Sequence, residues 1–403
     1  MQSIYIYTSL FPYSMVAENF LELELQTAAR MNMNVCVVPV SKDNEARQLP
    51  PDIRLDNGVC NASLLNRIKA ALFAFRPKII KQIVTNWERI RHPRNVIDFF
   101  KYLFAAGLVY NDVRRKADEQ PNCLFYSYWL SYPPIAFALY KSQHPGNMHR
   151  FIARGHGSDV YSSTASGVFY PLRKFVFQNL DRIFIVSSYG AEFLKKKYPE
   201  AALKIEVSRL GVLDNGIAHE EHNAVNLISC ARVCALKRIN LMFRSIVAFA
   251  RSHSKQSFTW THVGGGEMFY ALENEIKQTE VPSNLKVSLL GNRENKYILD
   301  LYGNNVFDCF LLTSTTEGIP VAIMEAISSG IPVLSTDVGG VKEIVTKGTG
   351  RTIPANFTQD EFDEALDYII INKRNLSKSA HDFYLRYYNS DANYKEFYDK
   401  ISK

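Results

Sequence analysis

The sequence predicts an α/β protein of two domains, each built around a doubly wound parallel sheet. Apolar strand-like segments alternate with amphipathic helical segments along most of the chain, which is the rhythm of parallel sheets covered by helices. The length of 403 residues is too great for one ordinary core and suits two domains of about 200 residues each. A polar segment rich in turn residues, DNGIAHEEHNAVN, separates two periodic halves. We therefore expect one domain over 1–215 and a second over 216–403.

The first half begins with a β-loop-α-β unit, which is typical of a parallel sheet. Its strand, helix and second strand are expected at 3–10, 20–31 and 34–40. Further apolar runs predict strands, and segments of helical periodicity predict helices. The strands are expected at 123–129, 151–157, 182–188 and 204–212, and the helices at 133–143, 166–180 and 191–199.

The second half alternates more regularly and predicts a doubly wound domain. The strands are expected at 226–232, 258–264, 286–291, 306–313 and 332–336, and the helices at 239–252, 267–279, 296–304, 321–329 and 341–345. From residue 361 onward the chain is helical, amphipathic and rich in tyrosine. We expect the last helix to pack back on the first domain.

Composition excludes several classes of protein. Hydrophobic residues make up 47% and charged residues 22%, which excludes disorder, coiled coils and collagen-like fibres. The chain has no apolar run of about 18 residues and no secretory signal at its start, so we expect a cytoplasmic protein without a membrane span. Six scattered cysteines form no CxxC pair. We therefore expect free thiols in a reducing compartment, and no metal site.

The basic charge is concentrated in a helical insertion near 61–120. This stretch has 12 basic and 5 acidic residues, a net charge of 12 − 5 = +7. Apolar residues are interleaved with the cations, namely Phe73, Phe75, Ile79, Ile80, Ile83, Phe99, Phe100 and Phe104. One interpretation is a peripheral contact with the anionic inner face of a membrane, near a lipid-linked acceptor. The other is that the apolar residues pack on the sheet and the charges are solvated. The stretch has no nucleic-acid motif, so we expect no nucleic-acid partner.

The most informative segment is FLLTSTTEGIPVAIMEAISSGIPVLST. A strand ends near Thr313, a turn carries Glu317, and a helix carries Glu325 eight residues later. Ligands of open α/β sheets bind at the carboxyl ends of the strands, and the free amides of Gly318 and Ile319 favour an anion there. One loop could thus offer donors to a phosphate and carboxylates to hydroxyl groups. The alternative is that Glu317 caps the helix and Glu325 lies on its solvated face.

This segment resembles the E-x7-E signature of retaining glycosyltransferases of family 4. The matching residues are Glu317, Gly318, Ile319, Glu325, Ala326, Gly330, Ile331, Pro332 and Val333. The resemblance implies the GT-B fold, in which two Rossmann-like domains face each other across a cleft. It also implies that Glu317 contacts the donor sugar, that Glu325 contacts the ribose, and that Gly318 and Ile319 bind the donor. Pro320 stands where many members have glycine, and it removes one possible amide donor.

A second element, LISCARVCALKRIN, resembles the family's strand-Arg-x4-Lys element. The resemblance implies that Arg232 and Lys237 hold the donor diphosphate. Two fixed cations there would offset the charge that develops on the leaving group, without a metal ion. Solvated surface cations are the alternative. Arg238 stands where many members have glycine.

A third element, FIARGHGSDVYSS, resembles the loop of the first domain that faces the donor sugar. The resemblance implies that His156 touches the transferred sugar, and Asp159 is expected to order the loop. Weaker matches place Gly264 and Gly265 in a tight turn at the cleft, and Asn292 near the nucleotide base. Glu18 either points into the cleft or lies at a solvated helix start.

Together these resemblances imply a hexosyltransferase that uses a nucleotide-sugar donor and no cofactor. The acceptor would be a hydroxyl of a glycan or lipid-linked molecule, the configuration would be retained, and cell-surface polysaccharide assembly would be the setting. A GT-B epimerase, a phosphorylase and a non-catalytic sugar- or membrane-binding scaffold are the alternatives. A nicotinamide-dependent oxidoreductase would need a G-x-G-x-x-G after a first strand, and the sequence has none.

Overall fold

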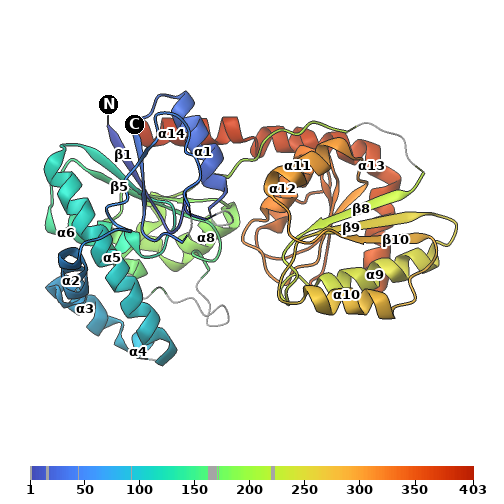
Figure 1. Ribbon diagram of the computed structural model, residues 1–403, viewed down its shortest axis with the longest axis horizontal. Coiled ribbons are helices and arrows are strands. Elements are labelled where there is room, and N and C mark those ends of the chain that lie inside the picture. The colour runs from blue at the N-terminus through green and yellow to red at the C-terminus, as the bar shows by residue number, and fades with distance from the viewer. Residues whose placement is uncertain are drawn as a thin grey trace. The chain divides into compact units, whose positions relative to one another are not determined.

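The computed structural model describes residues 2–14, 18–43, 45–91, 93–161, 170, 172–218 and 223–403. The chain divides into two compact units (Figure 1). The N-terminal domain comprises Met1–Leu210 together with Asn393–Lys403, and the C-terminal domain comprises Gly211–Ala392. The sequence pattern places the boundary near residue 215.

A seven-stranded sheet in the order β3-β2-β1-β4-β5-β6-β7 forms the centre of the N-terminal domain. All neighbouring strands pair in parallel. The strands are β1 (Ser3–Thr8), β2 (Val35–Pro39), β3 (Arg54–Leu55), β4 (Cys123–Ser127), β5 (Arg150–Gly155), β6 (Arg182–Ile185) and β7 (Ile205–Val207). Every residue of β1, β2 and β4 is buried, because helices cover both faces of the sheet.

Helices α1 (Phe20–Arg30) and α14 (Ser390–Ser402) supply apolar side chains to the core on one face of this sheet. Phe397 of α14 packs on Tyr126 and Phe184, with ring centroids 5.3 Å and 5.1 Å apart. The other core cluster contains residues of α5 (Pro93–Glu119), α6 (Pro133–Gln143), α7 (Arg173–Asn179) and α8 (Ser188–Lys197). Each face of the sheet therefore has its own core.

The predicted basic insertion is helical. It consists of α2 (Leu64–Ala71), a 3-10 helix (Leu72–Phe75), α3 (Pro77–Thr85), α4 (Trp87–Ile90) and the long helix α5. The interpretation that these apolar residues pack on the sheet holds for some of them, and the membrane contact stays a prediction. Phe73, Ile79 and Phe99 are buried, and Ile83 packs partly buried against the core. Phe75, Ile80, Phe100 and Phe104 are exposed.

The C-terminal domain has a six-stranded sheet in the order β10-β9-β8-β11-β12-β13, again with parallel pairs. Its strands are β8 (Val225–Cys230), β9 (Phe258–Val263), β10 (Leu285–Leu289), β11 (Cys309–Leu312), β12 (Val333–Thr336) and β13 (Gly350–Ile353). Its helices are α9 (Ile239–Ser252), α10 (Phe269–Gln278), α11 (Asn295–Asn304), α12 (Val321–Ser328) and α13 (Gln359–Tyr387). Helices α9 and α10 lie on one side of the sheet, and α11 and α12 on the other (Figure 1).

The predicted class of two doubly wound α/β domains is thus confirmed, with local corrections. The helix expected at 341–345 is only a short 3-10 helix, Val341–Glu343. Of the helix expected at 166–180, the described part is α7, which begins at Arg173, and residues 166–169 and 171 lie outside the described residues. Within the described ranges, none of the helices has the length and apolar character needed to cross a membrane.

Candidate functional site

The order of the C-terminal sheet reverses between β8 and β11, from which the strands run outward to β10 and to β13. In open parallel sheets such a switch point opens a crevice at the carboxyl ends of the two central strands. Lys237 follows β8 and Glu317 follows β11, so the topology brings these two residues to one place. Lys237 Nζ lies 2.5 Å from Glu317 Oε1.

The two loops that carry this pair are tied to each other through the backbone. The amide of Thr315 donates to the carbonyl of Leu236 at 2.8 Å, and Thr313 Oγ1 donates to the carbonyl of Lys237 at 3.0 Å. These hydrogen bonds fix the backbone beneath Lys237. The side chains of Lys237 and Glu317 keep 27% and 9% of their surface exposed, so the pair is shielded but reachable from solvent.

Arg238 holds the same loops together. It has a φ of 51°, in the left-handed region that favours glycine, which explains why glycine suits this position. The left-handed conformation costs a side-chain-bearing residue roughly 1–2 kcal/mol. The Arg238 guanidinium offsets this strain by donating to the carbonyls of Thr313 at 2.6 Å and Ala355 at 2.8 Å. The Arg238 guanidinium therefore binds to backbone carbonyls within the fold.

Two glycines that the sequence analysis did not single out pack against the backbone of the loop that carries Glu317. Gly339 has a φ of 55°, and a Cβ atom there would lie 1.8 Å from the carbonyl oxygen of Glu317. The amide of Gly340 donates to the carbonyl of Gly318 at 3.1 Å. Only a glycine allows this approach of the loop after β12 to the loop after β11. The Gly-Gly pair that follows the predicted strand at 332–336 is the sequence signal for it.

Arg232 lies just after β8, in the same loop as Lys237 and beside the turn that follows β9. Its Nε atom is 3.0 Å from Glu267 Oε2, and both side chains are mostly exposed. Gly264 has a φ of 133°, and a Cβ there would lie 2.0 Å from the carbonyl oxygen of Ala231. The structure thus brings the predicted Gly264 turn against the backbone next to Arg232.

Asn292 is engaged by the same turn. Its Oδ1 atom accepts a hydrogen bond from the amide of Gly265 at 2.7 Å, and the amide of Gly264 donates to the carbonyl of Gly291 at 2.8 Å. The predicted residues Gly264, Gly265 and Asn292 therefore lie together. In this arrangement the Asn292 side chain shapes the turn.

Glu325 is buried on α12, so the alternative of a solvated helix face is wrong. Its Oε1 accepts a hydrogen bond from Asn295 Nδ2 at 2.7 Å. Burial raises the pKa of Glu325 to about 7, and the hydrogen bond from Asn295 opposes that rise. Asn295, the first residue of α11, was not identified from sequence, because no local pattern links it to a residue thirty positions away.

The amides of Gly318 and Ile319 lie in the turn before α12. Within the described residues, neither amide donates a hydrogen bond to a protein acceptor. Free amides at the start of a helix are suited to an anion. Pro320 is the N-cap of α12 and contributes no amide. Among the described residues, no group of three or more His, Cys, Asp or Glu side chains is arranged to hold a metal ion.

In the N-terminal domain, Asp159 orders the loop after β5. Its carboxylate accepts from the amides of His156 at 2.7 Å, Gly157 at 3.1 Å and Leu130 at 2.8 Å. Burial alone would raise the pKa of Asp159, but His156 and the backbone donors hold that pKa below its usual value. His156 Nδ1 lies 3.9 Å from Asp159 Oδ2, which is too long for a hydrogen bond.

Glu18 is buried, so a solvated helix start is wrong for it. Its carboxylate accepts from the amides of residues 9–11 at 2.8, 2.9 and 2.7 Å, and from Trp129 Nε1 at 2.6 Å. The strand order of this sheet reverses between β1 and β4. Glu18 lies in the segment after β1, and Trp129 lies in the segment after β4. The ring of His156 packs on Trp129 and Tyr128, with centroids 4.6 and 4.7 Å apart. Trp129 is therefore a further residue that the sequence analysis missed.

Comparison with known proteins finds a family match for the segment that carries the Lys237–Glu317 pair. Residues 220–385, which contain it, match the family "Glycosyl transferases group 1". These residues form a group 1 glycosyltransferase domain. The domain includes Arg232, Lys237, Glu317 and Glu325.

Curated relatives of the chain are also glycosyltransferases. The putative colanic acid biosynthesis glycosyltransferase WcaL of Salmonella typhimurium is 31% identical over 220 residues, which cover 51% of each chain. The O-antigen biosynthesis glycosyltransferase WbnH of Escherichia coli is 30% identical over 126 residues, which cover 31% of this chain and 33% of WbnH. The chain thus spans about half the length, or less, of these relatives.

Solved glycosyltransferases share the fold over the whole chain. The lipopolysaccharide outer core galactosyltransferase WaaB has a TM-score of 0.67 and 14% identity, with coverage of 100% of this chain and 99% of WaaB. Anabaena HepE, solved in complex with UDP and glucose, has a TM-score of 0.66 and 13% identity, with full coverage of both chains. The group 1 glycosyltransferase domain therefore belongs to a chain with the GT-B type of fold.

Proposed function

We propose that the chain transfers a sugar from a nucleotide-diphosphate donor to a hydroxyl of a glycan or lipid-linked acceptor, in the assembly of a cell-surface polysaccharide. The observation that carries this proposal is the Lys237–Glu317 pair at the switch point of a group 1 glycosyltransferase domain. Relatives named for colanic acid, O-antigen and amylovoran biosynthesis support the setting. We place the reaction in the cytoplasm, at the inner face of the membrane when the acceptor is lipid-linked.

The donor would bind at the carboxyl edge of the C-terminal sheet. Lys237 and Arg232 would hold the diphosphate, with the amides of Gly318 and Ile319 as further donors. In the structure each cation is paired with a carboxylate, Lys237 with Glu317 and Arg232 with Glu267. Donor binding would exchange these partners for phosphate oxygens and release the Glu317 carboxylate toward the sugar hydroxyls.

Glu325 would accept a hydrogen bond from a ribose hydroxyl. Its carboxyl is already held by Asn295 and its pKa is raised to about 7, so near neutral pH it exists partly in the protonated form. A hydroxyl donor would favour the ionised form, which accepts more strongly. The nucleotide would then bind more tightly above pH 7 than below it.

The transfer would retain the configuration by a front-face path. The acceptor oxygen forms the new bond to the anomeric carbon while the bond from that carbon to the phosphate oxygen breaks. The departing phosphate oxygen takes the acceptor proton, so no enzyme carboxylate is needed as nucleophile or base. Lys237 and Arg232 would stabilise the growing negative charge, which is why we propose a reaction that needs neither a metal ion nor a cofactor.

The N-terminal domain would serve the acceptor and the transferred sugar. His156 lies in a loop fixed by Asp159 and against the rings of Trp129 and Tyr128. Both of its ring nitrogens are buried and lack a hydrogen-bond partner among the described residues. A buried imidazole of this kind gains from a ligand hydroxyl, because an unpaired buried polar group is unfavourable.

A donor panel tests the proposal. Thermal unfolding with UDP-, GDP- and ADP-sugars should show one nucleotide class raising the melting temperature, since a ligand stabilises in proportion to ln(1 + [L]/Kd). Incubation of that donor with an acceptor extract should then yield a labelled glycan with the donor's anomeric configuration. The proposal would be contradicted if none of the sugar nucleotides raised the melting temperature, or if a free epimer were released in place of a glycan.

A further inference from the structure

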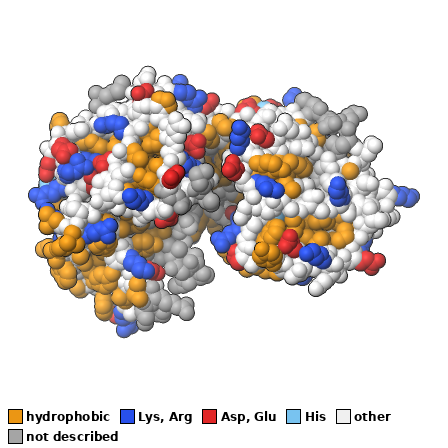
Figure 2. Space-filling model, in the orientation of Figure 1, with side chains coloured by type: hydrophobic (Ala, Val, Ile, Leu, Met, Phe, Trp, Pro, Cys, Tyr) orange, Lys and Arg blue, Asp and Glu red, His pale blue; other side chains and the backbone are white. Residues whose placement is uncertain are grey.

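Exposed apolar side chains are concentrated on the helical insertion. Of the twenty large hydrophobic side chains that are exposed in the described part of the chain, eleven lie between residues 64 and 104. They are Leu64, Leu65, Ile68, Leu72, Phe75, Ile80, Val84, Trp87, Ile97, Phe100 and Phe104, and we call them the insertion surface. Figure 2 shows hydrophobic side chains gathered at the lower left, where Figure 1 places α2–α5.

These side chains form a second apolar face on helices that already bury one. On α5, Phe99, Leu103 and Ala106 belong to the core, whereas Ile97, Phe100 and Phe104 repeat at helical spacing on the solvent side. None of the three solvent-facing residues belongs to the buried core cluster, although the ring of Phe100 contacts that of Phe99 at its edge. A patch of this extent marks an interaction site on a soluble domain.

The shorter helices of the insertion also expose apolar side chains. On α2 and the following 3-10 helix, Leu64, Ile68 and Leu72 are exposed at intervals of four residues. On α3, Ile79 is fully buried while Ile80 and Val84 are exposed, the latter with 70% of its surface accessible. Three successive elements therefore present an unpartnered apolar stripe.

Charge distinguishes the possible partners of the insertion surface. Residues 64–104 contain nine Lys or Arg and two Asp or Glu, a net charge of 9 − 2 = +7. A second copy of the same surface would place like charge against like charge. An anionic bilayer satisfies both properties, since its interior takes the apolar side chains and its headgroups attract the cations.

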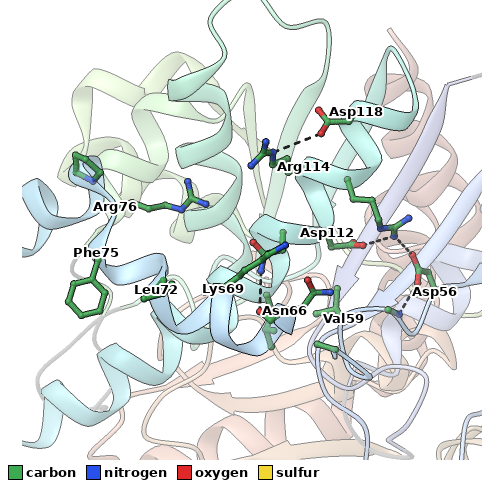
Figure 3. A pocket seen from close by; sticks show the side chains of 16 residues that line it. Asp56, Val59, Asn66, Lys69, Leu72, Phe75, Arg76, Asp112, Arg114 and Asp118 are labelled. Carbon is green, nitrogen blue, oxygen red and sulfur yellow. Dashed lines mark hydrogen bonds and ion pairs between the residues drawn. The ribbon is translucent and has the colours of Figure 1, made fainter. Parts of the chain in front are cut away.

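The insertion surface borders a pocket of about 1120 Å³ between α2, the 3-10 helix and α5 (Figure 3). Exposed apolar Leu72 and Phe75 line it together with Lys69 and Arg76. Its three acidic residues are each paired with a cation: Asp112 and Asp56 both pair with Arg115 and Lys116, and Asp118 pairs with Arg114. The pocket thus gives a lipid headgroup room beside the apolar side chains, with Lys69 and Arg76 to meet a phosphate.

We propose that the insertion surface docks this protein on an anionic lipid membrane. The apolar side chains enter the headgroup–acyl boundary and the surrounding lysines and arginines contact lipid phosphates. This inference stands on the N-terminal domain alone and does not depend on the chemistry proposed for the C-terminal domain. It would hold the enzyme beside a lipid-linked acceptor.

Vesicle co-sedimentation of the full chain tests the proposal. We expect binding to phosphatidylcholine vesicles that contain an anionic phospholipid and much weaker binding to phosphatidylcholine alone. Binding should fall between 0.1 M and 1 M salt, because the screening length falls from about 10 Å to about 3 Å. Salt-independent binding that is equal on both vesicle types would overturn the electrostatic part of the proposal, and no binding at low salt would overturn all of it.

Two sets of variants assign the binding to this surface. Lys69→Gln with Lys81→Gln should weaken binding about 25-fold, at about fivefold for each lost cation. Their matched control is Lys277→Gln with Lys286→Gln, two exposed lysines of the C-terminal domain, which should leave binding unchanged.

The apolar set is Phe75→Ser, Val84→Ser and Trp87→Ser, which should weaken binding about tenfold or more. The control set is Leu203→Ser, Tyr270→Ser and Ile371→Ser, whose side chains are at least as exposed. Because every set replaces exposed side chains, we expect all variants to fold. An unchanged melting temperature checks this. Equal losses in test and control sets would overturn the proposal. A second outcome would also overturn it. In that case light scattering would show that the wild type is an oligomer and that the apolar set is monomeric, and the wild type would not bind vesicles.

Discussion

Lys237 Nζ and Glu317 Oε1 lie 2.5 Å apart, on loops that follow the two strands between which the C-terminal sheet reverses its order. Contacts outside this pair also hold the two loops: Arg238 and backbone hydrogen bonds tie them together, and Gly339 packs against the loop that carries Glu317. The pair is shielded enough that each charge stabilises the other in the unliganded protein. A site of this kind keeps a cation and an anion ready for a ligand that carries both phosphate and hydroxyl groups.

Removal of either member of the pair should slow transfer strongly. Lys237→Ala and Glu317→Ala should each lower the transfer rate about 100-fold or more, in line with loss of one preorganised electrostatic contact. In the double variant the transfer rate should fall by less than the product of the two single-variant factors, because neighbouring groups act together. Initial rates with the donor chosen by the thermal-shift panel measure all three.

The control for this experiment is Arg244→Ala. Arg244 is mostly exposed on α9 and pairs with Glu275 away from the switch point, and an exposed ion pair contributes about 0–1 kcal/mol to stability. Its rate should stay within about twofold of the wild type. Near-normal rates for both Lys237→Ala and Glu317→Ala would remove the basis of the proposed function.

Glu325 should make the stability of the unliganded protein depend on pH. Below about pH 4.5 its carboxyl is protonated in both the folded and the unfolded chain. As the pH rises toward 7, the unfolded chain releases this proton while the folded chain retains it, so the free energy of unfolding falls by about 3 kcal/mol. Glu325→Gln cannot lose a proton and should escape this loss.

Thermal unfolding at several pH values checks this prediction. The difference in melting temperature between Glu325→Gln and the wild type should be small at pH 4.5 and should grow in favour of the variant up to pH 8. The same variant should bind the nucleotide more weakly, because the amide is a poorer acceptor than the carboxylate. A constant difference across the pH range would show that the carboxyl titrates normally.

Much of the fold follows from local sequence, because strands buried on both faces read as continuous apolar runs. β11 illustrates this, since Cys309–Leu312 is a run of apolar residues and all four are buried. The short edge strands were missed for the opposite reason. β3 has two residues, Arg54 and Leu55, and β13 has polar Arg351 and Thr352 in the middle. No periodicity can be read from so few mixed residues, and their pairing depends on the neighbouring strand.

The candidate site was predictable where its residues share a segment. The spacing of Glu317 and Glu325 places both near one strand end, and Arg232 and Lys237 share another loop. Asn295, at the start of α11, and Gly339, in the loop after β12, act on these residues from segments that come close only after folding. Burial is a further limit, since sequence alone left open whether Glu325 and Glu18 are solvated, and tertiary packing buries both.

The ion pair between Arg154 and Glu24 should be important for stability. Both side chains are fully buried, Arg154 also donates to Ser208 Oγ at 2.9 Å, and its guanidinium lies 4.1 Å from the ring centroid of Phe397 on α14. Arg154→Leu would leave an unpaired buried carboxylate and should lower the free energy of unfolding by about 3–5 kcal/mol. Adding Glu24→Leu removes that carboxylate and should restore much of the loss.

Denaturant unfolding followed by circular dichroism measures these changes. The control is Lys195→Ala, which breaks an exposed pair with Glu192 on α8 and should change the free energy of unfolding by less than about 1 kcal/mol. A loss in Arg154→Leu no larger than that of the control would mean that the buried pair makes no net contribution.

Gly339 and Gly291 offer a matched test of the support beneath Glu317. Both have left-handed φ values, 55° and 65°, so alanine at either position costs about 1–2 kcal/mol in backbone strain. A Cβ at Gly291 meets open space, whereas one at Gly339 would lie 1.8 Å from the carbonyl oxygen of Glu317. Gly339→Ala must therefore displace the loop that carries Glu317, and it should lose about 1–3 kcal/mol more than Gly291→Ala from overpacking. Melting temperatures with and without the donor should show donor stabilisation preserved in Gly291→Ala and largely lost in Gly339→Ala, and equal behaviour of the two variants would refute this role of Gly339.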